Sequence, residues 1–258
     1  MHHNRLPRLA TATLTLFFGL ALFAPLPFVV LTPGNAQDVL SKVITPAKTT
    51  STPLNFYKAD GHIYLLSILI TNPDAYVTGA ELIYSWARSD YSVMPRSLFY
   101  RDGVSATKEK AIAKTEMVDS QLSAKVAAIK YLQINAKPSD ISISLAKTGG
   151  PSGGLAFALG IVELLTPENF LRGRSVASTG TIDSDGNVGG IGGVAEKILA
   201  AHKAGADLIL VPKSNCKDLA PGVANIPKGI KIVAVGTLKE AITALNSAAP
   251  HSCANLGA

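Results

Sequence analysis

One glycine-rich segment places a serine in a setting that suits nucleophilic chemistry. The segment Gly149-Gly150-Pro151-Ser152-Gly153-Gly154 follows an expected strand and precedes an apolar run typical of a helix. Glycines permit tight turns and close approach of a substrate, and proline restricts the entry of the chain. N–H groups at a helix start have no partner within the helix, so Ser152 could attack a carbonyl group while they bind the oxyanion. Taken alone, the pattern also fits a structural turn, because serine is a favoured N-cap residue.

Lys197 is the candidate general base for that serine. The helix expected after Gly193 has an apolar stripe formed by Val194, Ile198 and Ala201. Lys197 is three residues after Val194 and four before Ala201, so it shares that face. Burial can lower the pKa of a lysine from about 10.4 by up to about 3–5 units, which makes the amine a base near neutral pH. The other interpretation is that the ammonium group reaches past the apolar face to water.

Histidine, the more usual base, is placed less well. The five histidines are His2, His3, His62, His202 and His251. The first two precede a long apolar run, the last lies near the C-terminal end, and His202 lies about 140° around the helix from Lys197. His62 opens an expected strand and remains a candidate on position alone, because catalytic partners need only be close in space.

Other motifs are weaker. Residues 190–195 fit a loose dinucleotide fingerprint but follow an expected hairpin rather than a long buried strand. Residues 183–187 resemble a calcium loop, yet the glycine stands fourth and no glutamate closes the loop, so a hairpin turn is favoured. Neither cysteine has a second Cys or His at ligand spacing, and no Walker A motif occurs. We therefore expect no metal, no cofactor and no ATP-driven step.

The elements that must position these residues alternate between strands and helices. The predicted strands cover residues 63–70, 141–145, 175–182, 208–211 and 231–235, and the predicted helices cover 81–88, 116–132, 155–165, 193–204 and the segment from Thr237. This alternation predicts an α/β or α+β domain. We divide the chain into a basic tip at 1–8, an anchor at 9–31, a juxtamembrane linker at 32–56, a β portion with an insertion at 57–116, and a catalytic core at 117–258.

The N-terminus combines positive charge with a long apolar run. Arg5 and Arg8 precede residues 9–31, which contain no charged residue. A run of this length can span about 30 Å of hydrocarbon, and its positive flank should stay in the cytoplasm. We therefore expect one transmembrane helix in the cytoplasmic membrane, with lipid around residues 9–31 and the catalytic domain outside the cytoplasm. The other interpretation is a signal peptide cleaved after Gly34-Asn35-Ala36.

The composition narrows the classes of partner and of compartment. Charged residues make up 16% and hydrophobic residues 47%, which excludes a disordered chain. The net charge is +6, but the cations are scattered and form no basic run among aromatic residues, so we expect no nucleic-acid partner. In an extracytoplasmic domain the two cysteines, Cys216 and Cys253, can form one disulfide.

Several short blocks together resemble one known family. The blocks are Gly150-Pro151-Ser152-Gly153-Gly154, Thr179-Gly180-Thr181-Ile182, Gly186-Asn187-Val188, Ile191-Gly192-Gly193, Glu196-Lys197, the run from Ala200 to Gly205, and Val211-Pro212-Lys213-Ser214-Asn215. In order and spacing they resemble the Lon protease proteolytic domain over residues 117–246. That resemblance implies a ribosomal protein S5 domain 2-like α+β fold. It also implies a dyad of Ser152 and Lys197, with Thr179 hydrogen-bonding near the lysine and with Gly150, Pro151 and Gly153 shaping the turn.

The resemblance is closest to membrane-anchored Lon-like proteins that lack an ATPase domain and often carry a PDZ domain. Three features depart from that pattern. The stretch between Ile70 and Met117 is short for a PDZ domain, Gly153 replaces the usual alanine, and Gly149 stands where many relatives have an acid. The first departure concerns how substrate is delivered, and the other two concern the surroundings of Ser152.

These observations predict an ATP-independent, membrane-anchored serine endopeptidase. Its partners would be unfolded or flexible protein segments outside the cytoplasm. Two alternative functions stand beside this one. One is a small-molecule kinase of similar fold, whose glycine- and serine-rich loop binds ATP phosphates at a helix start. The other is a membrane-anchored binding module without activity, although a buried lysine without a role is costly. Assembly into a homo-oligomer is also compatible with the sequence.

Overall fold

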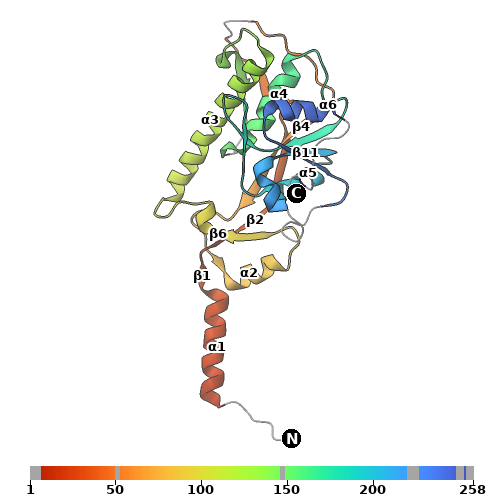
Figure 1. The fold of residues 1–258 in the computed structure, drawn as a ribbon. Helices are drawn as coiled ribbons and strands as arrows, with labels where there is room; N and C mark the ends of the chain where they lie inside the picture. The colour runs from red at the N-terminus through yellow and green to blue at the C-terminus, as the bar shows by residue number, and fades with distance from the viewer. Residues whose placement is uncertain (1–6, 50–52, 146–148, 220–226, 248–252, 254–258) are drawn as a thin grey trace.

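The computed structural model describes residues 7–49, 53–145, 149–219, 227–247 and 253 (Figure 1). The helices are α1 (Arg8–Phe23), α2 (Gly79–Trp86), α3 (Ala106–Leu132), α4 (Gly154–Leu165), α5 (Val194–Lys203) and α6 (Leu238–Asn246), with short 3-10 helices η1 (Arg96–Leu98), η2 (Pro138–Asp140), η3 (Pro151–Gly153) and η4 (Lys213–Leu219). The strands are β1 (Pro25–Leu26), β2 (Phe28–Asp38), β3 (Ile44–Pro46), β4 (His62–Ile70), β5 (Val77–Thr78), β6 (Ser92–Pro95), β7 (Ile141–Ile143), β8 (Ser175–Ser178), β9 (Thr181–Ile182), β10 (Val188–Gly189), β11 (Leu208–Pro212) and β12 (Lys231–Val235).

A six-stranded mixed sheet is the centre of the domain. Its strand order is β12-β11-β8-β4-β2-β6. The neighbours from β12 to β4 pair in parallel, whereas β2 pairs antiparallel with both β4 and β6. The predicted strands at 63–70, 208–211 and 231–235 correspond to β4, β11 and β12. The domain is therefore a mixed α/β structure.

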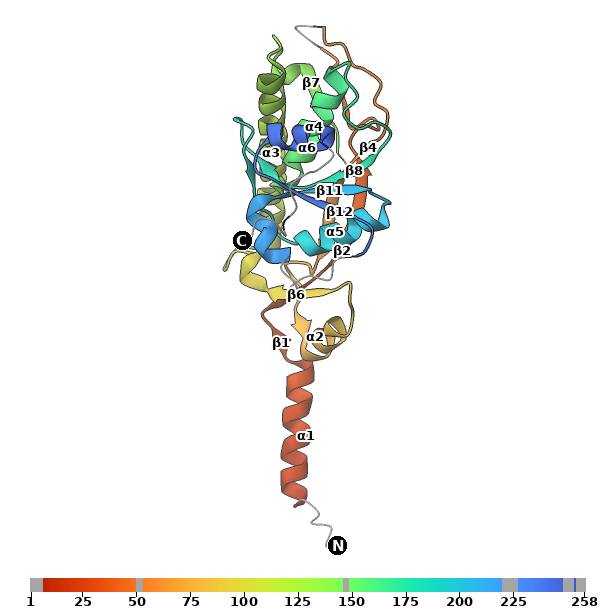
Figure 2. The ribbon, with the colours of Figure 1, turned by 45° about the vertical axis from the view of Figure 1, so that its right-hand side comes forward.

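Helices cover both faces of this sheet, and successive strand residues contribute to different cores. In β11, Leu210 packs with the core that holds α3, α4 and α6, whereas Ile209 packs with the core that holds α5. In β4, Leu65 and Leu66 divide in the same way. Because side chains alternate across a strand, continuous apolar runs are expected when both faces are covered. The three layers can be followed in Figures 1 and 2.

The predicted transmembrane helix at 9–31 is wrong in its extent. The helix α1 ends at Phe23, and β1 and β2 follow it. Pro25 and Pro27 account for the break, because proline lacks an N–H and disfavours the helical conformation in the residue before it. Val29 and Leu31 then lie fully buried in the sheet. Among the described residues, no helix is both long enough and apolar enough to cross a membrane.

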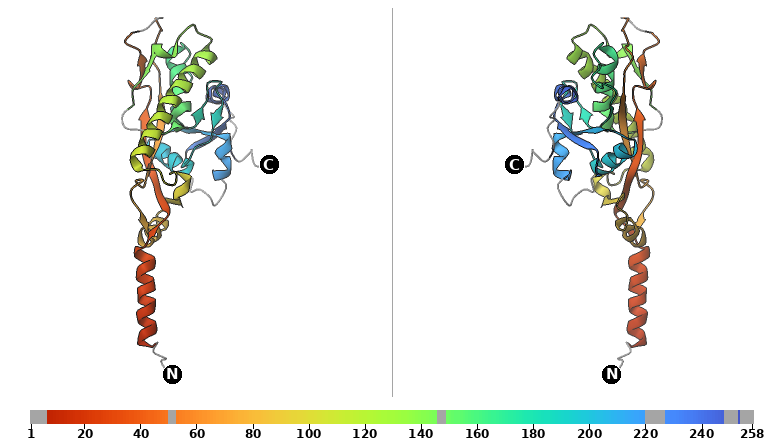
Figure 3. Two further views of the ribbon diagram at one scale, coloured as in Figure 1. Left: turned by 90° about the vertical axis from the view of Figure 1, so that its left-hand side faces the viewer. Right: turned by 90° about the vertical axis from the view of Figure 1, so that its right-hand side faces the viewer.

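The helix α1 nevertheless extends away from the body of the molecule and contacts it only near its C-terminal end, where Gly79 packs against Ala21 (Figure 3). None of its residues is buried. The side chains of Leu9, Phe17 and Phe18 are each more than 60% exposed. The predicted basic tip at 1–8 lies outside the described residues except for its last two positions.

The predicted juxtamembrane linker at 32–56 is largely structured. Strand β2 continues to Asp38 beside β4, and β3 pairs with β7. Val39, Val43 and Ile44 are at most 3% exposed and belong to the main core. The polar residues between them masked these core positions in the sequence. The predicted boundary between residues 116 and 117 is also displaced, because it falls inside α3.

The insertion between β4 and α3 contains β5, α2 and β6. The helix predicted at 81–88 corresponds to α2, which begins two residues earlier at a Thr78 N-cap. Thr78 and Glu81 form a reciprocal capping box, in which each side chain accepts a hydrogen bond from the other residue's N–H. Strand β6 then joins the edge of the large sheet beside β2.

A disulfide joins η4 to the C-terminal segment. Cys216 and Cys253 are bonded, with Cα atoms 5.2 Å apart, which is the pairing expected from the two cysteines. Thiol titration of the denatured, unreduced chain should find no free thiol, and titration after reduction should find two. Because the bond closes a loop of 37 residues, Cys253→Ser should lower the free energy of unfolding by about 2–4 kcal/mol. Two reactive thiols before reduction would contradict the bridge.

Candidate active site

Ser152 lies at a sharp turn that leads into the buried helix α4. The turn begins at Gly150, whose φ of 88° is a conformation that side-chain-bearing residues rarely adopt. Pro151 occupies the first position of η3, where its missing N–H costs no helical hydrogen bond. The Gly150 N–H donates to the Ala113 carbonyl oxygen of α3 at 2.9 Å, which holds the start of the turn. Ser152 itself is partly exposed, so a ligand can reach its hydroxyl group.

Hydrogen bonds fasten this turn to the segment after β8. The Ser152 carbonyl oxygen accepts from the Gly180 N–H at 2.9 Å and from Thr179 Oγ1 at 3.3 Å. In return, the Leu155 N–H donates to the Gly180 carbonyl oxygen at 3.1 Å. From α3, Ser120 Oγ donates to the Pro151 carbonyl oxygen at 2.9 Å. The backbone of Ser152 is therefore held from both sides.

Gly153 sits where the structure has no room for a side chain. A Cβ atom at this position would lie 2.3 Å from Leu65 Cδ1 and 3.2 Å from the Phe157 ring. Both neighbours are buried, with Leu65 3% exposed and Phe157 fully buried. The glycine at position 153 is thus matched by the large leucine opposite it on β4.

Lys197 points from α5 into the same site. Its Nζ donates to Ser152 Oγ at 2.7 Å and to Thr179 Oγ1 at 3.2 Å. The lysine is 2% exposed and Thr179 is fully buried. The predicted proximity of Ser152 and Lys197 is confirmed, and the expected apolar stripe of Val194, Ile198 and Ala201 is buried as well. The alternative in which the ammonium group reaches water is wrong for this arrangement.

Burial changes the acidity of Lys197. Desolvation lowers the pKa of Lys197 from 10.5 to about 7, although the nearby Glu196 carboxylate opposes this by favouring the ammonium form. A neutral amine is then well populated near pH 7, and it can accept a proton from the hydroxyl group 2.7 Å away. The arrangement can support a serine nucleophile with a lysine base.

His62 lies at the wrong end of the sheet for this role. It is paired with Ser175 at the start of β8, whereas Thr179 follows the end of β8. Four residue steps along the strand separate Ser175 from Thr179, which is about 13 Å. His62 Nδ1 instead lies 2.8 Å from Asp38 Oδ2.

Three polar residues around the site were not predicted from the sequence to contribute to it. Ser120 bonds the turn, as described above, and Asn215 exchanges two hydrogen bonds with the backbone of Ile191, before α5. Glu196 is 2% exposed, and its Oε2 has no hydrogen-bond partner among the described residues. Asn215 and Glu196 stand within the blocks that resemble the Lon domain, but neither spacing nor composition indicates their contacts.

Known proteins match the part of the chain that builds this site. Residues 107–247, more than half of the 258 residues, match the family described as Lon protease (S16) C-terminal proteolytic domain. The chain is 42% identical over 93 residues to Lon protease of Haemophilus influenzae, which covers 36% of this chain and 11% of that protein. It is 34% identical over 135 residues to Lon protease of Xanthomonas oryzae pv. oryzae, which covers 52% of this chain and 16% of that protein. The matched stretch thus spans about a tenth to a sixth of the length of these relatives.

The contact between Gly153 and Leu65 predicts how substitutions at these two positions affect stability. Gly153→Ala should lower the free energy of unfolding by about 1–3 kcal/mol, because the new methyl group overpacks against Leu65 Cδ1 and Phe157. Leu65→Val removes the closest atom, so the double variant should lose less stability than the sum of the two single variants. Urea unfolding of all four chains measures this coupling, and strictly additive losses would show that the two positions do not interact.

The buried lysine predicts that the effect of Lys197→Met on stability depends on pH. Since the pKa of Lys197 is about 7 in the folded chain and 10.5 in the reference state, the unfolded chain binds more protons between these values. The burial cost is therefore fully present below pH 7 and disappears as the pH rises toward 10.5. Lys197→Met removes this cost, so its stability advantage should reach a few kcal/mol below pH 7 and shrink at higher pH, at about 1.4 kcal/mol per pKa unit.

Urea unfolding of the wild type and of Lys197→Met across this pH range measures the difference. The matched control is Lys203→Met on the same helix, where the lysine side chain is 61% exposed. That variant should follow the pH dependence of the wild type. A constant difference between Lys197→Met and the wild type at all pH values would contradict a lowered pKa.

Proposed function

Because the chain belongs to the Lon protease (S16) C-terminal proteolytic domain family, we propose that it is a serine endopeptidase with a Ser152–Lys197 dyad. The observation that carries the proposal is the 2.7 Å contact between Lys197 Nζ and Ser152 Oγ. The buried setting of the lysine supports it, since the neutral amine is the form that can act as a base. Neither the kinase nor the inactive binding module requires this contact.

The proposed reaction is acyl transfer in two steps. Ser152 Oγ attacks the substrate carbonyl carbon, and its proton passes to the Lys197 amine. The resulting ammonium group protonates the leaving amine, which frees the first product and leaves an acyl-enzyme. Water then attacks the ester carbonyl, Lys197 accepts one of its protons, and that proton returns to Ser152 as the second product leaves.

The Thr179 hydroxyl group and two backbone N–H groups support the dyad in this scheme. Thr179 Oγ1 accepts a hydrogen bond from Lys197 Nζ at 3.2 Å, which directs the amine. It also donates to the Ser152 carbonyl oxygen at 3.3 Å. The N–H groups of Ser152 and Gly153 lie in the first turn of a helical segment, where such donors lack intrahelical acceptors. They are the groups that we assign to the oxyanion, because charge develops on the oxygen beside Ser152.

The proposed substrates are unfolded or flexible protein segments. The proposed cleavage does not use ATP, and the 258 given residues contain no Walker A motif. An extended segment can add to a sheet edge through main-chain hydrogen bonds, which does not require a defined sequence. Self-association of the chain is part of the proposal and is measurable by light scattering of the purified protein in detergent.

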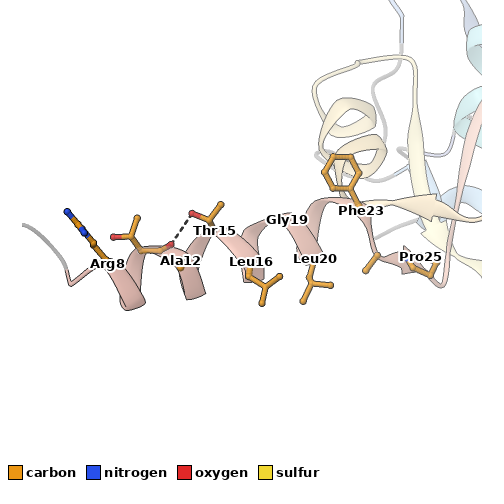
Figure 4. Close-up of a pocket in the computed structure, with 10 residues that line it drawn as sticks. Arg8, Ala12, Thr15, Leu16, Gly19, Leu20, Phe23 and Pro25 are labelled. Carbon is orange, nitrogen blue, oxygen red and sulfur yellow. Dashed lines mark hydrogen bonds between the residues drawn. The ribbon is translucent and has the colours of Figure 1, made fainter.

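We place the catalytic domain outside the cytoplasm, attached to the cytoplasmic membrane through α1. The disulfide Cys216–Cys253 supports an oxidising compartment. Leu16, Leu20 and Phe23 of α1 are each more than half exposed, and Figure 4 shows Leu16 and Leu20 on the same side of the helix. The hydroxyl groups of Thr13 and Thr15 donate to helix carbonyl oxygens four residues earlier, both at 2.9 Å, so they do not need water.

The strand that follows α1 argues against removal of the N-terminus. A signal peptidase cut after Ala36 would divide β2, which ends at Asp38. It would remove Val29 and Leu31, which are fully buried, and the strand that pairs with both β4 and β6. The domain therefore needs these residues to fold, and α1 stays attached in our proposal.

The dyad gives a prediction for catalysis. Ser152→Ala should abolish cleavage of an unfolded protein substrate, and Lys197→Met should reduce kcat/KM by at least about 100-fold. The wild-type kcat/KM should rise with pH through about 7, because Lys197 must lose its proton to act as the base. Mass spectrometry of the products measures cleavage with and without ATP.

The matched control is Ser184→Ala, which changes an exposed serine in the turn between β9 and β10. This variant should cleave at the wild-type rate. Wild-type cleavage by Lys197→Met would contradict the proposed base. Binding of ATP without any cleavage would favour the kinase instead.

The location gives a separate prediction. Intact cells should hold the chain in the membrane fraction with its original N-terminal region attached, and protease added from outside should degrade the domain after Phe23. Mass spectrometry of the membrane fraction identifies the N-terminus. A mature N-terminus at Gln37 would establish a signal peptide and exclude the anchor.

A further inference from the structure

A group of exposed aromatic and aliphatic side chains lies on the insertion between β4 and α3, which carries α2. We call it the collar, and it consists of Tyr76, Ile83, Tyr84, Trp86 and Leu98, which are between 56% and 71% exposed. Three of them lie on α2, where Ile83 and Tyr84 point away from the buried Leu82 and Ser85 and Trp86 is the last residue of the helix. Arg96, in the same short helix η1 as Leu98, holds that helix against the segment that carries Tyr76. Its guanidinium group lies 5.9 Å from the centre of the Tyr76 ring and donates to the carbonyl oxygens of Pro73 and Ala75.

The collar is held in a defined position relative to α1. After α1, the strand β1 pairs with β5, with Pro25 opposite Thr78. Thr78 is also the N-cap of α2, so the chain leaving α1 and the chain entering α2 are hydrogen-bonded neighbours. Gly79 packs against the backbone of Ala21 so closely that a Cβ atom there would meet the Ala21 carbonyl oxygen. Figures 1 and 2 show α2 at the end of the body from which α1 extends.

The length of α1 determines where the collar would lie in a membrane. The helix has 16 residues and is therefore about 24 Å long. The hydrocarbon core of a bilayer is about 30 Å thick, so a helix with Arg8 at the inner surface ends before the outer surface is reached. Entry of the elements packed on its C-terminal end into the outer interface is one way to accommodate this shortfall.

We propose that the collar is a membrane-docking surface that sits in the outer interfacial layer of the bilayer that holds α1. This inference rests on the membrane attachment proposed above, and it adds a second contact with lipid. Tyrosine and tryptophan favour that layer, because their rings are apolar and their N–H or O–H groups can meet water or headgroups. Ile83, on the helix that packs against α1, would contact the upper acyl chains.

Apolar contact, rather than charge, would hold the collar in place. Residues 71–105 contain three arginines and four acids, so this region has no positive excess for anionic lipid. Arg88 is paired with Asp90 at 3.1 Å, and Arg101 is paired with Glu109 at 3.0 Å. Docking should therefore be the same on zwitterionic and anionic vesicles and should resist salt.

Two contacts with one bilayer would restrict the rotation of the domain about α1. A single helix leaves the body free to tilt, whereas a rigid second surface beside it keeps the sheet at one angle to the membrane. The active site would then stay at a constant distance from the membrane surface. Substrates would be limited to segments that can reach the site at that distance.

The chain contains one tryptophan, Trp86, which is itself in the collar and reports its environment. The experiment uses the full chain in phosphatidylcholine vesicles. Trp86 emission should move to shorter wavelength compared with the water-exposed state. Lipids brominated near the headgroup should quench it more strongly than lipids brominated near the bilayer centre. Anionic vesicles and high salt should leave both results unchanged.

Two relocated tryptophans serve as controls in a Trp86→Phe background. Phe17→Trp on α1 should be quenched most by bromine near the bilayer centre, and Tyr131→Trp, near the end of α3 farthest from α1, should not be quenched (Figure 1). Quenching at position 17 with none at Trp86 would overturn the collar while leaving the anchor in place. A shifted emission without quenching by either lipid would also overturn it, because a second copy of the chain would then cover Trp86.

Absence of quenching at both positions 17 and 86 would refute the anchor and the collar together. Peptide cleavage by the same samples is measured separately, so the proposed catalytic function is tested independently. A further variant, Ile83→Asp, should reduce quenching of Trp86 by the shallow bromolipid while cleavage of a soluble peptide is unchanged, because α2 does not contribute to the dyad.

Discussion

The burial of one lysine amine against a serine hydroxyl group is the constraint on which the architecture depends. Lys197 is 2% exposed, and an ammonium group without water is costly unless it loses its proton or gains partners. Here both occur, because its pKa is lowered to about 7 and its Nζ has two hydroxyl partners. This arrangement is stable only if the surrounding layers keep water out while Ser152 stays within reach of a ligand.

Three segments far apart in the chain must meet to satisfy that constraint. Ser152 comes from the turn before α4, Thr179 from the segment after β8, and Lys197 from α5 on the other face of the sheet. The turn is held by backbone hydrogen bonds to Gly180 and Ala113, so its position does not depend on flexible side chains. The close fit of Gly153 against Leu65 connects this turn to the central strand β4. The packing of the sheet therefore determines where the Ser152 hydroxyl group lies.

The continuous apolar run at residues 9–31 is divided between two different settings. Residues up to Phe23 form an exposed helix, and residues from Phe28 form a strand whose alternate side chains are buried in the sheet. Hydropathy alone treats both as one run, because it records how apolar a residue is and not what covers it. The prolines at 25 and 27 mark the change, since they end the helix and allow only extended backbone beside them.

The sequence alone determined the pair of reactive groups, the disulfide partners and most elements from residue 60 onward. Periodicity placed Lys197 on the buried stripe of α5, and the blocks around Ser152 and Thr179 indicated the family, because these features depend on local spacing. Tertiary structure decided that β2 completes the sheet and that residues 39–44 enter the core. It also decided that Ser120 and Asn215 brace the site and that His62 lies at the opposite end of the strands. Those outcomes depend on which segments pack together, and contacts between distant segments leave no periodic signal in a single chain.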